Sequence, residues 1–137
     1  MNPSKNDATG RWIKIFDHRR LDRGFTLEPF GSRCVRTGEI HEIVVTDERQ
    51  EGLSKGEGGQ RVDRVAFIGF AEFTRAGVVE RGDLAIAGEA ELGVVMGFDS
   101  CHFPNHYNII IEAPRLVTGA ELGLELASSI IFRETSR

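Results

Sequence analysis

Residues 99–108 carry most of the side chains in this sequence that could do chemistry. An aspartate, a cysteine and two histidines lie here between two apolar stretches. Imidazole and carboxylate groups bind divalent metals such as zinc, iron or nickel, and imidazole also exchanges protons near neutral pH. We therefore take His102, His106 and Asp99 as the candidate catalytic residues.

A turn between the two histidines decides whether they can act together. Along an extended strand, positions four residues apart are separated by about 13 Å, which is too far for one metal ion to bridge. Pro104 has the φ favoured at the second position of a β-turn, and Asn105 tolerates the third. The sequence therefore predicts a turn centred on Pro104 and Asn105 that brings His102 and His106 together.

Three interpretations of this segment are open. In the first, the two histidines bind a divalent metal ion as a cofactor, and Asp99, Cys101 or His41 completes the set of ligands. In the second, one histidine exchanges a proton with a substrate while a carboxylate, Asp99 or Glu42, orients it. In the third, the histidines and asparagines only hydrogen-bond the loop.

Four further residues are candidates for contacts with a ligand. A nucleophilic cysteine needs a neighbouring cation that lowers its pKa, but adjacent residues of an extended chain point to opposite faces. Cys101 and His102 therefore meet only if the loop twists. His41 and Glu42 interrupt an apolar strand, which indicates that one face of this strand meets solvent or, as the alternative, a cleft. The candidate ligand contacts are Asn108, Tyr107, Cys101 and His41.

Short strands must position these side chains. Runs rich in β-branched and aromatic residues predict strands at residues 12–16, 25–27, 40–46, 65–73, 84–87, 92–98, 107–112 and 130–132. Glycines inside strand patterns mark bends or close approach of the backbone. The predicted fold is mainly β, a small closed or partly open β-barrel. The expected buried core contains Phe67, Ile68, Phe70, Val94, Val95, Ile109 and Ile111.

The ends of the chain and one long loop complete the predicted domain. Residues 1–10 are polar and predict a flexible tail, and residues 11–137 form a single domain. Residues 47–61 are glycine-rich with one apolar side chain, which predicts a mobile loop. Thr118 and Glu121 match a capping box and predict one short C-terminal helix before the last strand.

Composition and charge exclude several classes of protein. The chain has 137 residues, of which 40% are apolar, and a net charge of −4. Nucleic-acid binders normally carry a basic surface, and membrane spans need about 20 apolar residues in succession. The sequence has neither feature, no signal peptide and only two cysteines. We expect a cytoplasmic homo-oligomer, a homodimer, that binds a small polar molecule and neither nucleic acid nor membrane.

Two stretches of the C-terminal half match the pattern of a known family. Gly97-Phe98-Asp99, followed by Pro104 and by Asn108-Ile109, is similar to the sequence around the nucleotide and metal site of archaeal CTP-dependent riboflavin kinases. Residues 109–114, 122–124 and 130–132 resemble the closing strand, short helix and final strand of the same cradle-loop barrel. The resemblance implies that Asn108 contacts metal or phosphate.

Three functions follow from these observations. The first is a small-molecule enzyme that uses the histidine and aspartate side chains of residues 99–108, by metal-dependent or acid–base chemistry. The second is a non-catalytic protein that only binds a small ligand or assists a partner. The third, which the resemblance implies, is a flavin or nucleotide phosphotransferase of the riboflavin-kinase type.

Overall fold

The computed structural model describes residues 4–49 and 59–135, and all regular structure in them is strand. The prediction of a mainly-β fold is confirmed. The strands are β1 (Ala8–Arg20), β2 (Phe25–Thr26), β3 (Ser32–Val35), β4 (Ile40–Thr46), β5 (Arg61–Val62), β6 (Val65–Arg75), β7 (Gly77–Glu80), β8 (Leu84–Ala87), β9 (Ala90–Asp99), β10 (Asn108–Glu112) and β11 (Ser129–Arg133).

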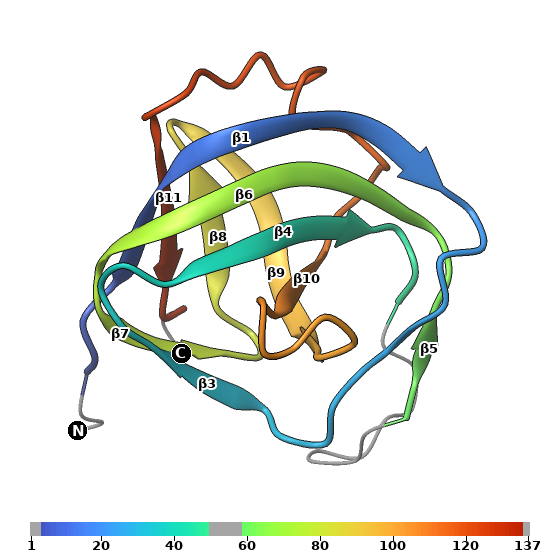
Figure 1. Ribbon diagram of the computed structural model, residues 1–137, viewed down its shortest axis with the longest axis horizontal. Coiled ribbons are helices and arrows are strands. Elements are labelled where there is room, and N and C mark those ends of the chain that lie inside the picture. Colours follow the sequence, from blue (N-terminus) through green and yellow to red (C-terminus); the bar gives the residue numbers. More distant parts are fainter. Residues whose placement is uncertain (1–3, 50–58, 136–137) are drawn as a thin grey trace.

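Seven strands join into a closed ring in the order β1-β11-β8-β9-β10-β4-β6, and β6 pairs again with β1 (Figure 1). The β10–β4 pair is parallel, while the other pairs of the ring are antiparallel. This parallel pair sets the end of the segment 99–108 beside a strand from the first half of the chain. The pairs β2–β5 and β3–β7 are separate two-stranded sheets.

The alternation of side chains along the strands divides the apolar residues into two clusters. One cluster receives residues from all seven strands of the ring, including Trp12, Ile43 and Phe98, and therefore fills its interior. The other contains Val44 and Ile110 from the opposite face of the same strands, covered by Phe25 and its neighbours on β2 and β5. The outer face of β4 and β10 is thus a second buried surface.

The predicted core is corrected at two positions. Phe70 is half-buried, on the outer side of β6, and Val94 is 40% exposed. Val94 precedes Val95, which points into the ring, and adjacent residues of a strand point to opposite faces. The remaining predicted core residues are buried, namely Phe67, Ile68, Val95, Ile109 and Ile111.

The predicted C-terminal helix is wrong, although its capping box forms. The Thr118 backbone N–H donates to Glu121 Oε1 at 3.0 Å, and the Glu121 N–H donates to Thr118 Oγ1 at 3.1 Å. The chain leaves this geometry after a single turn, because Gly123 adopts a left-handed φ of 69°. Within residues 4–49 and 59–135 there is no helix of the length and apolarity needed to cross a membrane.

Two predicted boundaries also change. Strand β1 begins at Ala8, whose side chain is fully buried, so residues 8–10 belong to the sheet and not to a tail. The predicted mobile loop, residues 47–61, falls mainly on residues 50–58, which lie outside the described part of the chain. Its last residue, Arg61, already belongs to β5.

Candidate functional site

A row of five paired residues crosses the outer face of the ring. Lys14 on β1 and Glu42 on β4 both pair with Phe70 on β6, which lies between them. Asn108 on β10 pairs with Glu42 on one side and with Asp99 on β9 on the other. Directly paired residues point to the same face of a sheet, so these five side chains are neighbours in space.

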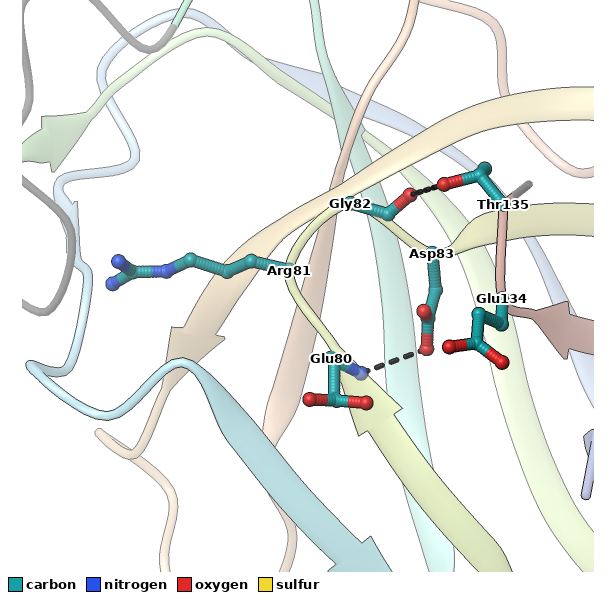
Figure 2. Close-up of a pocket in the computed structure, with 6 residues that line it drawn as sticks. All are labelled: Glu80, Arg81, Gly82, Asp83, Glu134 and Thr135. Atoms are coloured by element: carbon teal, nitrogen blue, oxygen red, sulfur yellow. Dashed lines mark hydrogen bonds between the residues drawn. The ribbon is translucent and has the colours of Figure 1, made fainter. Parts of the chain in front are cut away.

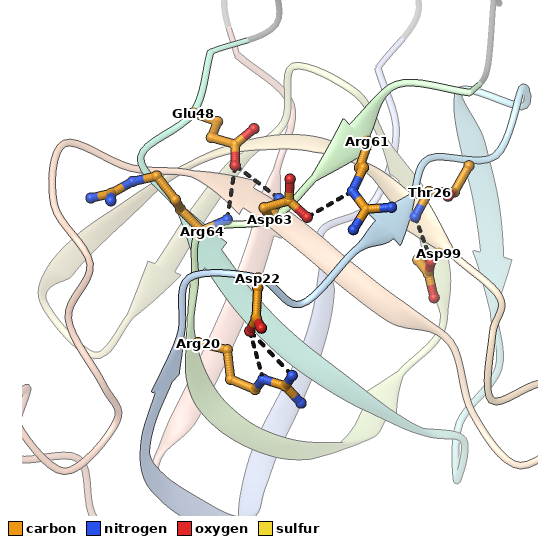
Figure 3. Close-up of polar contacts among 8 residues, drawn as sticks. All are labelled: Arg20, Asp22, Thr26, Glu48, Arg61, Asp63, Arg64 and Asp99. Carbon is orange, nitrogen blue, oxygen red and sulfur yellow. Dashed lines mark hydrogen bonds and ion pairs between the residues drawn. The ribbon is translucent and has the colours of Figure 1, made fainter.

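At one end of the row, the Asp99 carboxylate is fully hydrogen-bonded. Its oxygens accept from the Thr26 N–H at 2.9 Å (Figure 3), from the Cys101 N–H at 2.9 Å and from the Asn108 amide at 3.1 Å. Burial alone would raise the pKa of Asp99, but the hydrogen bonds from Cys101, Thr26 and Asn108 together lower it. Asp99 therefore stays ionised and ties β9, β2 and the loop together.

The middle of the row contains buried polar atoms with no hydrogen-bond partner. His106 Nε2 lies 3.8 Å from Glu42 Oε1, which is too long for a hydrogen bond. Among residues 4–49 and 59–135, neither His106 Nε2 nor Asn108 Oδ1 makes a hydrogen bond of ordinary length, although the Asn108 side chain lies close enough to His106 to raise its pKa. Asn108 as a whole is fully buried. Buried polar atoms of this kind cost free energy that a well-placed partner recovers.

The pKa values of this pair are shifted by its surroundings. Burial raises the pKa of Glu42 to about 7, against a smaller opposing effect of the Arg23 charge and with added repulsion from Asp99. Burial also lowers the pKa of His106, with contributions from His102 and His41 and with a smaller opposing effect of the Asn108 side chain. Near neutral pH, Glu42 is therefore present in both protonation states, and His106 is neutral.

The orientation of the His106 ring is fixed by its neighbours. The Asn105 side-chain amide donates to Nδ1 at 3.1 Å, so the ring proton of the neutral imidazole lies on Nε2 and faces Glu42. The ring packs edge-on against Phe70, with the ring centroids 5.0 Å apart. The neutral ring thus presents a hydrogen-bond donor towards the Glu42 carboxyl group.

The turn in the loop is centred on Phe103 and Pro104, one residue before the predicted centre at Pro104 and Asn105. The Asn105 N–H donates to the His102 carbonyl at 2.8 Å, which closes a turn over residues 102–105. The rings of His102 and His106 lie close together, with centroids 5.0 Å apart. Their environments differ, because His102 is exposed and His106 is buried.

Arg23 joins the loop from a part of the chain that the sequence did not single out. Its guanidinium lies 3.5 Å from Cys101 Sγ and 3.2 Å from His102 Nε2, so the loop does twist enough to turn both side chains towards one group. Burial and a hydrogen bond with Asp99 nevertheless raise the pKa of the Cys101 thiol, although Arg23 opposes this effect. These surroundings disfavour the thiolate that a nucleophilic cysteine needs.

His41 and Tyr107 belong to a different cluster. His41 Nδ1 accepts from the Tyr107 N–H at 3.0 Å, and Nε2 donates to Glu39 Oε1 at 2.7 Å. The Arg33 guanidinium covers the Tyr107 ring at 3.8 Å, and the His41 ring packs on Phe73 of the interior cluster. His41 and Glu42 are both buried, so the expectation that one side of this strand meets solvent is wrong.

The metal interpretation gains no support from the geometry. Across residues 4–49 and 59–135, no group of three or more histidine, cysteine, aspartate or glutamate side chains is arranged to hold a metal ion. Of the predicted additional ligands, Asp99 accepts hydrogen bonds from three donors, His41 is bonded to Glu39, and Cys101 Sγ lies beside the Arg23 guanidinium. Only His102 and His106 lie together as predicted.

A cavity of about 170 Å³ lies beside the turn between β7 and β8. In Figure 2 the carboxylates of Glu80, Asp83 and Glu134 gather around it, while Arg81 points away. Lys5 pairs with two of these carboxylates, because its Nζ lies 2.9 Å from Glu80 Oε1 and 2.6 Å from Asp83 Oδ2. These contacts anchor the N-terminal segment beside the cavity.

A groove of about 370 Å³ opens beside His106, on the other side of the row from Asp99. Its lining residues come from β1, the start of β4, β6 and the loop, and they are Ile13, Lys14, Ile40, Phe70, Asn105 and His106. Volumes of this size fall within the range of small-molecule sites. The groove gives a ligand access to the His106 ring.

Sequence reasoning identified the loop but not all of the site. Glu42 was considered only as a group that orients a histidine, and its one signal was a charge inside an apolar strand. Lys14 and Phe70 gave no functional signal, because each fits an ordinary strand pattern. Their meeting depends on the pairing of β1, β6 and β4.

Comparisons with known proteins place the chain in a family without naming an activity. The chain belongs to a protein family of unknown function (DUF6917), whose model matches residues 2–133. No curated protein and no solved structure matches it. The resemblance to riboflavin kinases therefore stays a prediction, and the chemistry of the site rests on its geometry.

Proposed function

We propose that this protein is an enzyme that transfers protons on a small molecule, with Glu42 and His106 as its acid–base pair. The observation that carries the proposal is the 3.8 Å gap between Glu42 Oε1 and the buried, unpaired His106 Nε2. Two groups at this separation do not hydrogen-bond to each other, but a third atom beside the pair can bond to both. In the proposed reaction this third atom is an oxygen or nitrogen of the substrate.

Each residue has a role in such a reaction. Glu42, with a pKa of about 7, can take up and return a proton near neutral pH, where general acid–base catalysis is most efficient. Neutral His106 donates from Nε2 to an oxygen that gains negative charge during the reaction. Asn108 Oδ1 accepts a hydrogen bond from the substrate, and Asp99 holds the Asn108 amide in place at 3.1 Å.

The alternatives fit these contacts less well. A phosphotransferase in a cradle-loop barrel has only the sequence resemblance in its favour, because no curated protein and no solved structure matches the chain. A non-catalytic binding protein is supported by the apolar groove, yet it gives no reason for a buried carboxyl group with a pKa near 7. Burial of unpaired acid–base groups costs stability and is typical of catalytic sites.

The experiment is an NMR titration of the Glu42 side-chain carboxyl carbon and of the His106 ring, from pH 4 to 9. We expect a Glu42 midpoint near 7, with a matching inflection in the His106 signals that disappears in Glu42→Gln. Glu89→Gln, which removes an exposed carboxyl group from the β8–β9 turn, is the matched control and leaves both titrations unchanged. A Glu42 midpoint below about 5 would refute the proposal, because the carboxylate would then be a weak base at neutral pH.

Activity provides the second test. Small molecules that perturb the His106 signals are incubated with wild-type protein and with Glu42→Gln in deuterated water. We expect exchange of a substrate proton for deuterium, slowed at least 100-fold by Glu42→Gln and by His106→Gln and unchanged by Glu89→Gln. Ligands that bind but undergo no exchange or conversion with the wild type would identify a binding protein instead.

A further inference from the structure

The groove beside His106 combines one cation with an apolar surface. Phe70 lies at its centre, and Ile13 and Ile40 flank it with 41% of each side chain exposed. Exposed β-branched side chains on both sides of an aromatic ring form a surface that gains free energy when an apolar body covers it. Lys14 stands on the same face, as the register partner of Phe70.

The charge of Lys14 is not neutralised within residues 4–49 and 59–135. Its Nζ has no carboxylate within 4.0 Å there, and its recorded contact is the face of the Phe16 ring, at 5.8 Å from the centroid. Two nearby carboxylates are engaged elsewhere, since Glu72 pairs with Arg11 and Glu39 with Arg33. A cation beside an apolar surface, with no counter-ion among the described residues, is complementary to an anion that carries an apolar body.

The register fixes how far apart the two ends of such a ligand lie. Lys14 and Glu42 pair with Phe70 from opposite sides, so their strands are two strand spacings apart, about 10 Å. A ligand whose anionic group meets Lys14 would lie over Phe70 and reach the Glu42–His106 pair with its other end.

From this arrangement we propose that the groove binds a small organic anion, a carboxylate or phosphate attached to an aromatic or branched apolar body, and that Lys14 receives the anionic group. The proposal rests on the proposed function for the role of the far end of the ligand. The binding itself depends only on Lys14 and the apolar lining. Its test can therefore fail while the acid–base pair stands, and the reverse also holds.

The test uses four probes whose binding is followed through the NMR signals of Phe70 and His106. Benzoate and phenyl phosphate carry both features, benzamide lacks the charge, and acetate lacks the body. We expect benzoate or phenyl phosphate to bind at least tenfold more tightly than benzamide and acetate. The stronger of the two anions then identifies carboxylate or phosphate as the natural group.

Variants assign the charge to one side chain. Lys14→Gln should weaken the better anion at least tenfold, while Lys14→Arg retains binding. Arg20→Gln, which removes an exposed cation paired with Asp22 at the end of the same strand, should have no effect. Equal affinity for benzoate and benzamide, or unchanged anion affinity in Lys14→Gln, would overturn the proposal.

Glu42→Gln separates this proposal from the acid–base function. The variant should bind the better anion as tightly as the wild type does, because Glu42 does not contact the anionic group, and should still lack proton exchange. Loss of anion binding in Glu42→Gln together with unchanged binding in Lys14→Gln would show that the anion depends on Glu42 and not on Lys14. This outcome would refute the role of Lys14.

Discussion

Two buried histidines, His41 and His106, differ in the hydrogen bonds of their ring nitrogens. His41 uses both ring nitrogens, one towards Glu39 and one towards the Tyr107 N–H. His106 uses Nδ1 with Asn105 and leaves Nε2 buried and unpaired beside Glu42. The His41 imidazole packs on Phe73, inside the closed set of strands, and the His106 imidazole packs on Phe70, on the outer face.

The two histidines illustrate how a buried polar group that is fully hydrogen-bonded differs from one that is not. Burial lowers the pKa of both imidazoles, so the direction of the shift does not distinguish them. The hydrogen bonds do distinguish them. A satisfied ring stabilises the fold, whereas an unsatisfied donor costs free energy that a bound ligand recovers.

The largest expected effect is the cost of removing the satisfied histidine. His41→Ala should lower the free energy of unfolding by about 3 to 4 kcal/mol, because it opens a cavity in the packing and leaves the Tyr107 N–H without its acceptor. His106→Ala should cost about 1 kcal/mol or less, since it also removes an unpaired buried donor. Urea denaturation at pH 7.5 measures both values. Equal losses would break the distinction between the two rings.

The free energy of unfolding should depend on pH through the buried Glu42 carboxyl group. Its pKa is about 7 in the folded protein and 4.5 in the unfolded chain, so folding is favoured when Glu42 is protonated. The contribution is fully present below about pH 4.5, is lost as the pH rises to about 7, and is constant above that. At 1.36 kcal/mol per pKa unit, Glu42→Gln should gain up to about 3 kcal/mol relative to the wild type across this window.

Denaturation of the wild type, Glu42→Gln and Glu89→Gln at pH 4.5 and pH 8 measures this difference. Glu89→Gln should follow the wild type at both pH values, because Glu89 is exposed. If Glu42→Gln also follows the wild type, the Glu42 carboxyl group is not destabilised by burial and the contrast with the satisfied residues disappears.

The smallest expected effect concerns the thiol of the loop. Burial and the neighbouring Asp99 raise the pKa of Cys101, so its thiolate should be scarce at neutral pH. Both cysteines are exposed, and we expect iodoacetamide to modify Cys101 about threefold or more slowly than Cys34 at pH 7.5, as read by mass spectrometry. Faster modification of Cys101 would mean that Arg23 activates the thiol, and the loop would then contain a nucleophile.

Local sequence patterns determined most of the strands and the position of the loop. Alternation and β-branched residues predicted the strands later seen as β4, β6, β8, β9, β10 and β11, because side chains of period two must bury one face. The close-approach role predicted for glycines also holds at Gly69, where an added Cβ would lie 2.1 Å from the Lys14 carbonyl oxygen. The short strands β3, β5 and β7 were not predicted, since their pairing and not their composition defines them.

The capping box shows where a correct local signal stops short of the structure. The reciprocal hydrogen bonds of Thr118 and Glu121 form as the pattern predicts. A helix also needs several further turns with an apolar face to bury, and Gly123 ends the segment after one turn. Local chemistry thus set the start of the element, and its length depended on what followed.

The sequence by itself determined that a chemically rich loop joins two apolar strands and that His102 and His106 face a turn. The residues that lie beside this loop are determined by the tertiary structure alone. The parallel pairing of β10 with β4 sets Asn108 beside Glu42, and the pairing of β6 between β4 and β1 adds Phe70 and Lys14. These partners lie 28 to 94 residues apart in the chain. The residue pattern of a single strand does not predict these pairings, because the order of strands in a sheet is fixed by the burial of whole faces against one another.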